Sequence, residues 1–391
     1  MAKNNKMPVI RFSGYTNVWE QYKLSDITEV IMGQSPSSKN YTDNPNDDIL
    51  VQGNADLKDG KVVPRLWTKE ITKTIDKGGI ILTVRAPVGD VAKTDYKVVL
   101  GRGVAGIKGN DYIYQFLQKL QYNRYWVSLS SGSTFESINS NDIKDLIIDI
   151  PSIEEQTKIS MLLNNVNSII TLHQRKLEKL KLTKKALLQK LFPQNGSKLP
   201  ELRFKGFTDA WEQRKLGEVV KSYSGGTPTA SNKEYYGGDI PFIRSAEINS
   251  DTTELYITQK GLDNSSAKIV EKGTILYAMY GATSGEVGIS KINGAINQAI
   301  LAMIPLNYDG KIIAQYLRKN KESIIGKYLQ GGQGNLSANI ILELPIQLPG
   351  LEESNQIAYF LESVDNIITL HHRKLEMLKN VKKGLLQKMF V

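Results

Sequence analysis

Two long stretches of the chain place apolar residues at alternating steps of four and three, over residues 152–191 and 350–389. This spacing puts the apolar side chains on one stripe of a helix and is typical of a coiled-coil seam. A helix of about 38 residues, or about 57 Å at 1.5 Å per residue, cannot bury such a stripe alone. We therefore expect two long helices that pack against each other. Their packing should be antiparallel, because a globular segment joins the end of the first to the start of the second.

The seam positions are the same in both stretches and run through one histidine and one lysine each. A polar seam residue disfavours slipped packing, so we interpret these as residues that fix the register. The alternative is that His173 and His371 form a metal or catalytic pair. The seam comprises Ile159, Leu163, Val166, Ile170, His173, Leu177, Leu180, Lys184, Leu187 and Leu191, and then Ile357, Leu361, Val364, Ile368, His371, Leu375, Leu378, Lys382, Leu385 and Met389.

The start of each predicted helix carries a capping signal. In "PSIEE", Ser152 is a candidate N-cap with Glu155 three residues later, which is the spacing of a capping box. Glu154 lies beside the positive end of the helix dipole. "PGLEE" repeats the scheme with Gly350.

These helices belong to an internal duplication. Residues 150–193 and 348–391 align without a gap, with 24 of 44 positions identical. Upstream, "PVIRFSGYTNVWEQYKL" (Pro8–Leu24) matches "PELRFKGFTDAWEQRKL" (Pro200–Leu216). The order is an anchor, a variable segment and a helix, and then the same again. We expect the anchor tryptophans, Trp19 and Trp211, to lie in the core.

The two variable segments, 20–150 and 212–348, differ in sequence, but their glycine- and proline-rich loops and apolar runs occur at corresponding places. Short apolar runs at residues 80–84, 274–278 and 299–304 predict strands, and clusters of Gly, Pro, Ser and Asn predict loops between them. Residues 112–120 and 311–328 predict a helix late in each segment. The expected fold class is α+β, with two pseudo-repeated globular domains joined by the two long helices. The predicted division is 1–150, 151–193, 194–348 and 349–391.

Composition narrows the class of protein. There is no cysteine, which excludes a disulfide framework, a thiolate zinc site and a cysteine nucleophile. The formal charge of +10 suits a polyanionic partner such as nucleic acid, although ordinary solvation is the alternative. The basic faces of the two helices could likewise be solvated, or could dock onto partner subunits or DNA. No stretch is long and apolar enough for a membrane span, and no signal peptide is recognisable, so we expect a soluble cytoplasmic protein.

Motifs for chemistry within the chain are missing. The sequence contains no P-loop, no G-x-G-x-x-G that opens a helix, and no N/D-P-P-[FYW] methyltransferase loop. The nearest string, "DNPNDD", lacks the second proline and the aromatic residue. We expect no catalytic residues, no metal site and no cofactor in this chain.

The duplicated "IPSIEEQTKI…LLQKLF" and "LPGLEESNQI…LLQKMF" segments, the "WEQ-x-KL" anchors and "SGGTPTASNKEYYGGDIPFI" (Ser224–Ile243) resemble the DNA-specificity subunits of type I restriction–modification systems. The resemblance covers essentially the whole chain, but the first half departs from the last motif. It implies two target-recognition domains on conserved helical spacers. It also implies two methylation subunits as partners and restriction subunits bound through them. S-adenosylmethionine, ATP and Mg would be used in those partner subunits.

Loop residues that can donate hydrogen bonds to base edges or phosphates are the candidate DNA contacts. We expect Arg102 and Gln298 at equivalent places, for guanine and adenine respectively, unless Arg102 merely pairs with Asp95. The Gly-Gly-Thr-Pro loop could also be a plain structural turn. The candidates are Ser35, Ser37, Ser38, Lys39, Arg85, Arg102, Thr227, Thr229, Ser231, Lys233, Arg244, Tyr280, Asn297 and Gln298.

The predicted function is therefore recognition of an asymmetric, bipartite double-stranded DNA target by two domains at a fixed spacing. Two other classes remain open on the sequence. One is a scaffold whose two domains bind proteins or RNA, which salt-dependent binding to duplex DNA would separate from the first reading. The other is a self-contained enzyme, which methylation activity of the isolated chain would support.

Overall fold

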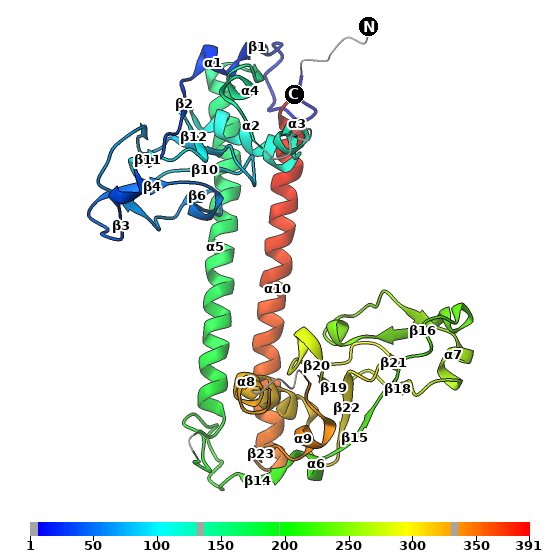
Figure 1. Ribbon diagram of the computed structural model, residues 1–391. Helices are drawn as coiled ribbons and strands as arrows, with labels where there is room; N and C mark the ends of the chain where they lie inside the picture. The colour runs from blue at the N-terminus through cyan, green and yellow to red at the C-terminus, as the bar shows by residue number, and fades with distance from the viewer. Residues whose placement is uncertain (1–6, 131–136, 195, 330–334) are drawn as a thin grey trace. The chain divides into compact units, whose positions relative to one another are not determined.

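The computed structural model describes residues 7–130, 137–194, 196–329 and 335–391, and these form two compact units (Figure 1). Unit 1 contains the chain up to Arg175 together with Arg373–Val391, and unit 2 is Lys176–His372. Both boundaries fall inside the long helices, α5 (Ile153–Leu191) and α10 (Leu351–Met389). Each unit therefore contains the first part of one long helix and the last part of the other. The predicted four-part division of the chain instead treats the helices as separate spacers.

The two long helices pack antiparallel, as their seams predict. In unit 1, Ile159 and Leu163 near the start of α5 share an apolar cluster with Leu386 and Met389 near the end of α10. Unit 2 has the mirror arrangement, in which the end of α5 clusters with the start of α10. Pairing of a start with an end in each unit is what an antiparallel pair requires.

The burial of the helix positions follows the predicted seam. All twenty seam residues are buried or half-buried, including both histidines and both lysines. Apolar residues off the seam vary, since Leu172 and Leu182 keep 67% and 68% of their surface exposed, whereas Leu386 keeps 0% and Ala358 1%. None of the positions at the four–three spacing is exposed, but they do not include every buried apolar residue of the two helices.

The predicted capping box at the start of α5 is only half present. Ser152 Oγ accepts a hydrogen bond from the Glu155 N–H at 3.4 Å. The Glu155 carboxylate, however, accepts two hydrogen bonds from the Arg11 guanidinium, at 2.8 and 2.9 Å. Arg203 and Glu353 repeat this pair in unit 2, with both bonds at 2.7 Å. The sequence reasoning missed these partners because the arginines lie more than 140 residues upstream.

The globular part of unit 1 is layered. A sheet with the strand order β2-β12-β9-β10-β6-β5 lies between the helices α2, α5 and α10 on one face and a second sheet, β3-β7-β4-β11-β8, on the other. β1 and β13 form a separate antiparallel ladder. The strands are β1 (Glu20–Lys23), β2 (Val30–Met32), β3 (Tyr41–Thr42), β4 (Asp48–Val51), β5 (Leu57–Lys58), β6 (Lys61–Val62), β7 (Trp67–Thr68), β8 (Thr74–Ile75), β9 (Ile80–Thr83), β10 (Val91–Lys93), β11 (Val98–Leu100), β12 (Val104–Ile107) and β13 (Ile147–Ile150).

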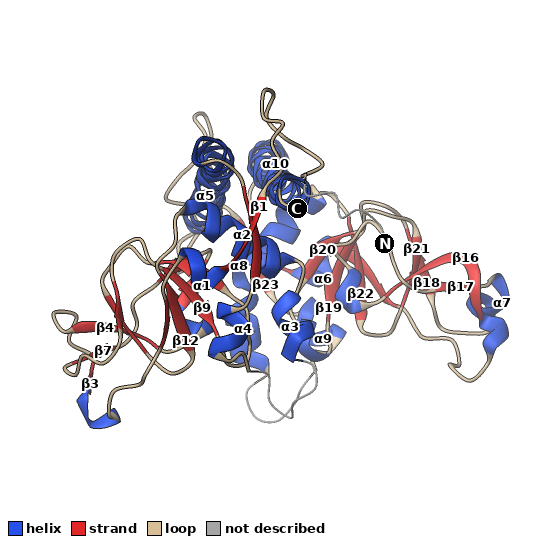
Figure 2. Cartoon of the chain, turned by 90° about the horizontal axis from the view of Figure 1, so that it is seen from above, coloured by secondary structure: helices blue, strands red, loops and turns tan. Residues whose placement is uncertain are grey.

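Unit 2 has the same layers with simpler sheets. The order β15-β22-β19-β20 faces the helices, and β17-β16-β21-β18 forms the outer sheet, beside α7 (Gln259–Asp263) at one end of the unit (Figure 2). β14 and β23 form the ladder that corresponds to β1 and β13. The strands are β14 (Glu212–Lys215), β15 (Val220–Ser224), β16 (Tyr236–Ile243), β17 (Tyr256–Ile257), β18 (Lys268–Val270), β19 (Ile275–Ala278), β20 (Val287–Ile289), β21 (Gly294–Ile296), β22 (Ile300–Pro305) and β23 (Pro345–Leu348).

The helices confirm the α+β assignment. The two predicted late helices are present as α2 (Asp111–Tyr122) and α8 (Gly310–Tyr328). The shorter helices of the described chain are α1 (Leu24–Ile27), α3 (Tyr125–Ser130), α4 (Ser140–Lys144), α6 (Leu216–Val219) and α9 (Ala338–Leu342), with 3-10 turns η1 (Ser38–Asn40), η2 (Asn54–Asp56), η3 (Lys233–Tyr235), η4 (Ser245–Glu247) and η5 (Gly281–Thr283).

The continuous apolar runs of the central strands are explained by burial on both faces. In β9, Ile80 and Leu82 join the cluster beneath the helices, whereas Ile81 joins the cluster between the two sheets. β19 alternates in the same way. Trp19 and Trp211 are each 2% exposed within the helix-side clusters, which confirms them as core anchors.

Candidate nucleic-acid interface

Glycines bring two loops together at the same place in each unit. In unit 2, the chain leaving β15 runs against the chain leaving β21, and the Gly226 N–H donates to the Ile296 carbonyl at 3.2 Å. A Cβ on Gly225 would lie 1.9 Å from that carbonyl oxygen, so no other residue fits. In unit 1, a Cβ on Gly33 would lie 2.1 Å from the Gly101 carbonyl oxygen. We call these contacts the unit 1 loop pair (residues 33–38 and 101–103) and the unit 2 loop pair (residues 225–229 and 297–299).

The unit 2 loop pair joins two of the predicted DNA contacts directly. The Thr227 hydroxyl donates a hydrogen bond to Gln298 Oε1 at 2.6 Å. The loop is fixed on the far side of Thr227 as well, because the Tyr236 hydroxyl donates to the Pro228 carbonyl at 2.7 Å. Both Thr227 and Gln298 are nevertheless exposed. Their outer atoms can therefore meet a ligand while their positions are set from within.

The unit 1 loop pair brings Ser35 to Arg102, at the positions equivalent to Thr227 and Gln298. Ser35 Oγ accepts a hydrogen bond from the Arg102 backbone N–H at 3.1 Å, which leaves the guanidinium out of the contact. Asp95, the alternative partner of Arg102, pairs instead with Lys61 at 2.8 Å. Among the residues that the structure describes, no carboxylate pairs with the Arg102 guanidinium. The exposed cation is available for an anionic or base-edge partner.

Two other candidates occupy equivalent places on a separate loop. Arg85 and Tyr280 follow β9 and β19, and each forms an isolated backbone bridge, to Ser137 and Asn335 respectively. Lys39 and Lys233 lie on the 3-10 turns η1 and η3. None of the fourteen candidates is buried. The exposed ones are Ser37, Ser38, Lys39, Arg85, Arg102, Thr227, Thr229, Ser231, Lys233 and Gln298, and the half-buried ones are Ser35, Arg244, Tyr280 and Asn297.

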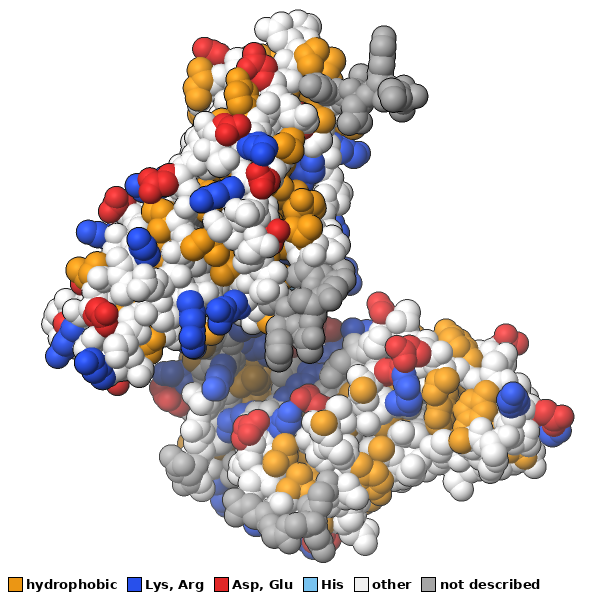
Figure 3. Space-filling view, turned by 45° about the horizontal axis from the view of Figure 1, so that its top comes forward, with side chains coloured by type: hydrophobic (Ala, Val, Ile, Leu, Met, Phe, Trp, Pro, Cys, Tyr) orange, Lys and Arg blue, Asp and Glu red, His pale blue; other side chains and the backbone are white. Residues whose placement is uncertain are grey.

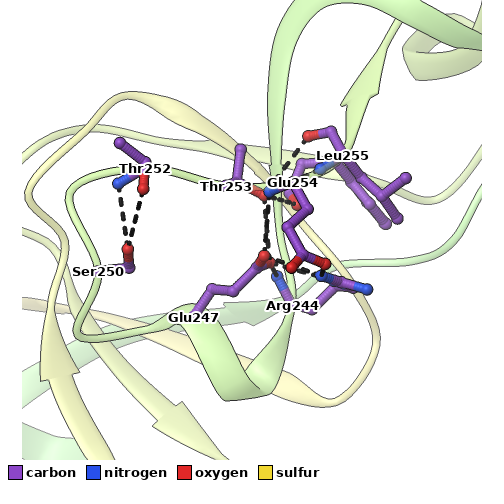
Figure 4. A network of polar contacts seen from close by, with 8 residues as sticks. Arg244, Glu247, Ser250, Thr252, Thr253, Glu254 and Leu255 are labelled. Atoms are coloured by element: carbon purple, nitrogen blue, oxygen red, sulfur yellow. Dashed lines mark hydrogen bonds and ion pairs between the residues drawn. The ribbon is translucent and has the colours of Figure 1, made fainter. Parts of the chain in front are cut away.

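Arg244 is tied into a network that the sequence did not reveal (Figure 4). Its guanidinium donates to Glu247 at 2.9 and 3.2 Å and to Glu254 at 2.7 Å. Burial opposes ionisation of Glu247, but hydrogen bonds from Arg244, the Glu254 N–H and Thr253 outweigh it and lower its pKa to about 2. The two carboxylates also raise the pKa of Arg244. Contact with DNA would require Arg244 to give up these partners, so it is better placed to hold the loop at residues 245–254.

Glu70 plays a similar supporting part in unit 1. Its carboxylate accepts hydrogen bonds from the Ser37 N–H at 2.8 Å and from Asn40 Nδ2 at 2.7 Å. These bonds, with Asn40 contributing most, lower the pKa of Glu70. Neither Glu70 nor Glu254 carries a local sequence signal for its role. Only the three-residue spacing of Arg244 and Glu247 could have suggested a pair.

A second surface lies on the long helices, away from their seams. Three exposed apolar residues of α5, at steps of eight and three, have apolar and exposed counterparts 198 residues later in α10. The exposed fractions match within one percentage point in two pairs, Ile169 44% and Ile367 45%, and Leu172 67% and Leu370 66%, whereas Tyr359 at 73% is more exposed than Met161 at 60%. We call them the α5 stripe, in unit 1, and the α10 stripe, in unit 2.

Other kinds of site have less support. Among the described residues, no group of His, Cys, Asp or Glu side chains is arranged to hold a metal ion. Within the same part of the chain, none of the helices combines the length and apolar character that crossing a bilayer requires. On the face shown in Figure 3, Lys and Arg side chains are interspersed with Asp and Glu. On this face, the distribution of charge does not by itself outline a binding surface.

Comparison with known proteins places these features in a family. The family model described as "Type I restriction modification DNA specificity domain" matches residues 17–182 and 208–380. The putative type I restriction enzyme MjaX specificity subunit of Methanocaldococcus jannaschii is 31% identical over 185 residues, which are 44% of this chain and 42% of that protein. The MjaIX specificity subunit of the same organism is 25% identical over 296 residues, covering 70% of this chain and 68% of that one.

Solved structures support the fold. The S subunit of a type I restriction–modification system from M. genitalium superposes with a TM-score of 0.65 at 16% identity, over 98% of this chain and 99% of that one. A chain from a structural study of complex assembly and conformational transition in the type I R-M system gives a TM-score of 0.58 at 20% identity, over 95% and 97%.

Proposed function

Because this chain belongs to the type I restriction modification DNA specificity family, as a specificity subunit with two target recognition domains, we propose that each domain reads one half of a bipartite DNA sequence. In this proposal the chain recognises the DNA sequence, and partner subunits catalyse the reactions. Methylation with S-adenosylmethionine, and ATP- and Mg-dependent restriction, would take place there. The matched region spans 42% of the MjaX relative.

The observation that carries the proposal is the pair of glycine-set loops. An equivalent backbone hydrogen bond joins the loops in both units, from Gln34 to Leu100 and from Gly226 to Ile296. The loops present different side chains, Arg102 in one and Gln298 in the other. A guanidinium suits the two acceptors of guanine, and a carboxamide suits the acceptor and donor of adenine. Two loop pairs with a similar backbone and different exposed side chains support two different half-sites, and hence an asymmetric target.

The long helices are proposed to set the spacing of the half-sites. Each helix of 39 residues contributes to both units. At 1.5 Å per residue such a helix is about 58 Å long, whereas half-sites on one face of DNA lie about 34–36 Å apart. The helices are therefore long enough to fix that separation with length left for attachment of the domains.

The stripes support two copies of one partner. The α5 stripe and the α10 stripe are equivalent in the repeat, and all six of their residues are exposed. A contiguous exposed apolar patch is typical of a protein–protein interaction site, and two equivalent patches suit two copies of one partner. We propose that one methylation subunit docks on each stripe and that restriction subunits bind through these.

The proposal is tested by methylome sequencing of cells with and without this gene. We expect loss of adenine methylation at one asymmetric, bipartite motif when the gene is deleted. An unchanged methylome, together with no salt-dependent binding of the purified complex to duplex DNA, would favour the protein- or RNA-binding scaffold instead.

Partner stoichiometry is tested on the stripes. We expect Leu172→Glu or Leu370→Glu to remove one copy of the partner from the complex purified through a tag on this chain, and the double variant to remove both. Native mass spectrometry reads the copy number. Leu182→Glu is the matched control, because Leu182 is equally exposed and its counterpart in the repeat is the polar Asn380. Two partner copies retained in the double variant would contradict docking on the stripes.

A further inference from the structure

We propose that Arg65 of unit 1 binds a backbone phosphate of the DNA in the half-site that Arg102 contacts. The inference rests on the proposed function and adds a binding residue to it. Its starting point is an ion pair in which Arg65 Nε donates to Asp56 Oδ1 at 3.0 Å. The Asp56 side chain is 5% exposed, whereas the Arg65 side chain is 58% exposed.

Arg65 lies at the same end of the outer sheet as Arg102. β4 and β11 are parallel neighbours, so the loops that follow them leave at one end of the strands, and one of these loops carries Arg102. β7 runs antiparallel to β4, so the residues that precede β7 lie at that end too. The Leu50 N–H donates to the Leu66 carbonyl at 2.9 Å, which extends this pairing as far as the neighbour of Arg65.

Asp56 joins Arg65 to the loop that supports Arg102. Its Oδ2 accepts a hydrogen bond from the Gln52 N–H at 2.7 Å. The Gln52 carbonyl in turn lies so close to Gly103 that a Cβ there would be 2.1 Å from its oxygen. The buried carboxylate therefore holds Arg65 and the backbone beside Arg102 in one arrangement.

The ion pair occupies Nε and leaves the terminal nitrogens of the guanidinium for a ligand. Within the residues that the structure describes, these nitrogens of Arg65 make no hydrogen bond. Their parallel N–H groups match two oxygens of a phosphate. Because Asp56 already holds the guanidinium in place, less side-chain entropy is lost when the phosphate binds.

This attachment favours a phosphate over a base edge. The major groove is about 8.5 Å deep and the phosphates line its rim, so a base contact needs a side chain that extends away from the protein. Arg65 is held through Nε by an almost fully buried carboxylate, so little of its side chain can extend. No carboxylate of the described chain holds the Arg102 guanidinium, which can reach further.

Unit 2 has a similar arrangement in which the cation is already paired. Asp56 and Glu247 each end a 3-10 turn that follows the parallel strand of the outer sheet, and each accepts a hydrogen bond from an arginine. In unit 2 that arginine, Arg244, also donates to Glu254 at 2.7 Å. We therefore expect this phosphate contact in the half-site of unit 1 and not in that of unit 2.

The experiment uses the complex purified through a tag on this chain and a duplex that carries the motif found by methylome sequencing. Competition binding is measured over a series of salt concentrations. In separate duplexes, each base pair of the motif is changed, or one phosphate is replaced by an uncharged methylphosphonate. A phosphate contact then has a readout that a purely structural role of Arg65 does not change.

The variants are Arg65→Gln, the double variant Asp56→Asn with Arg65→Gln, and Arg214→Gln. The double variant removes one positive and one negative charge, so it keeps the net charge and leaves no buried carboxylate unpaired. Arg214→Gln is the matched control for the single variant. Arg214 is 50% exposed and ion-paired with Glu212, in the ladder of β14 and β23.

We expect Arg65→Gln to weaken binding to every duplex by about fivefold at about 0.15 M salt. The slope of log affinity against log salt should fall in magnitude by about 0.9, the contribution of one phosphate. The double variant should behave alike, and Arg214→Gln should change neither quantity. One methylphosphonate should weaken the wild-type complex by a similar factor and have no effect on either Arg65 variant. Unchanged base preferences in both half-sites show that the variants are folded.

Wild-type affinity and slope in both Arg65 variants would remove Arg65 from the interface, although recognition of the motif would stand. Weakened binding with undiminished sensitivity to every methylphosphonate would also overturn the inference. Loss of base preference in the double variant would assign Arg65 to base reading or to the fold of unit 1, and not to a phosphate. If the wild-type complex binds all duplexes alike, the proposed function itself fails.

Discussion

Arg11 and Arg203 show how single residues fasten each anchor segment to a long helix. Each forms a bidentate pair with a glutamate in the first turn, and the Arg11 and Glu155 side chains are only 10% and 1% exposed. Charges removed from water cost free energy unless they are paired and hydrogen-bonded, so loss of one partner leaves the other stranded. The arginine therefore matters less for attraction than for keeping Glu155 buried without penalty.

We expect Arg11→Ala to lower the free energy of unfolding by about 3–5 kcal/mol, the range for breaking a buried pair by removing one partner. Urea unfolding measures it. Lys23→Ala is the control, because its pair with Asp145 is more than half exposed on both sides. That variant should change stability by less than about 1 kcal/mol. Equal effects of the two substitutions would show that burial does not decide the contribution.

Lys184 and Lys382 occupy equivalent seam positions, but Lys184 is half-buried and Lys382 is buried, and their partners differ. Lys184 pairs with Asp365 at 2.6 Å. The residue equivalent to Asp365 in unit 1 is Asn167, and Lys382 donates instead to the neutral Gln118 at 2.9 Å. Burial without a countercharge lowers the pKa of Lys382 to about 8.

Stability should therefore rise with pH because of Lys382. Below pH 8 both states carry the proton and the cost of burying the charge is fully present. Between about pH 8 and the unfolded value near 10.4, the unfolded chain holds a proton that the folded chain lacks, so the cost is relieved as pH rises. We expect Lys382→Met to raise stability at pH 7 and to flatten this rise, as measured by urea unfolding from pH 7 to 10. A pH profile parallel to that of the wild type would contradict the assignment.

At the scale of elements, the seam is the feature on which the long helices depend. Leu177 is 6% exposed on the seam, and Leu182, five residues later on the same helix, is 68% exposed. The two leucines have the same helix propensity, so a difference between them reports burial alone. Placing an unpaired carboxylate in an apolar contact is costly, whereas placing it in water is not.

We expect Leu177→Asp to destabilise the protein by several kcal/mol and Leu182→Asp by less than about 1 kcal/mol. Thermal and urea unfolding of the two variants make the comparison direct. Similar losses for both would mean that helix propensity, and not the seam, sets the stability of α5.

At the scale of the whole molecule, the proposed function separates base identity from spacing. Inserting one heptad after Arg175 in α5 and another after His372 in α10 keeps the four–three seam and lengthens both helices by about 10.5 Å. We expect the methylated motif to keep the bases of both half-sites and to gain about three base pairs between them, at 3.4 Å each. Methylome sequencing reads both quantities, and altered half-site bases would contradict the separation.

The insertion has an internal control. A heptad placed in α5 alone leaves the two seams unequal in length, so their ends can no longer pair in both units. That variant should lose the motif altogether rather than shift its spacing. A shifted motif from the single insertion would show that one helix is enough to set the distance.

Much of this protein was determined by the sequence alone, because its main signals are periodic or repeated. The four–three spacing defines the buried face of a helix whatever it packs against, so α5, α10 and their seam residues were predictable one by one. The central strands were predictable for the same local reason, as apolar runs bounded by glycine. The duplication then implied two like domains.

Contacts between residues far apart in the chain were decided only by the tertiary structure. Arg11 reaches Glu155 across 144 positions, and Thr227 reaches Gln298 across 71, with no local pattern to announce either. Asp95 was a reasonable partner for Arg102 by its nearness in sequence, yet the fold pairs it with Lys61. Which partner a side chain binds depends on the distances that tertiary packing sets between residues. Those distances are defined only when the sheets and helices have packed together.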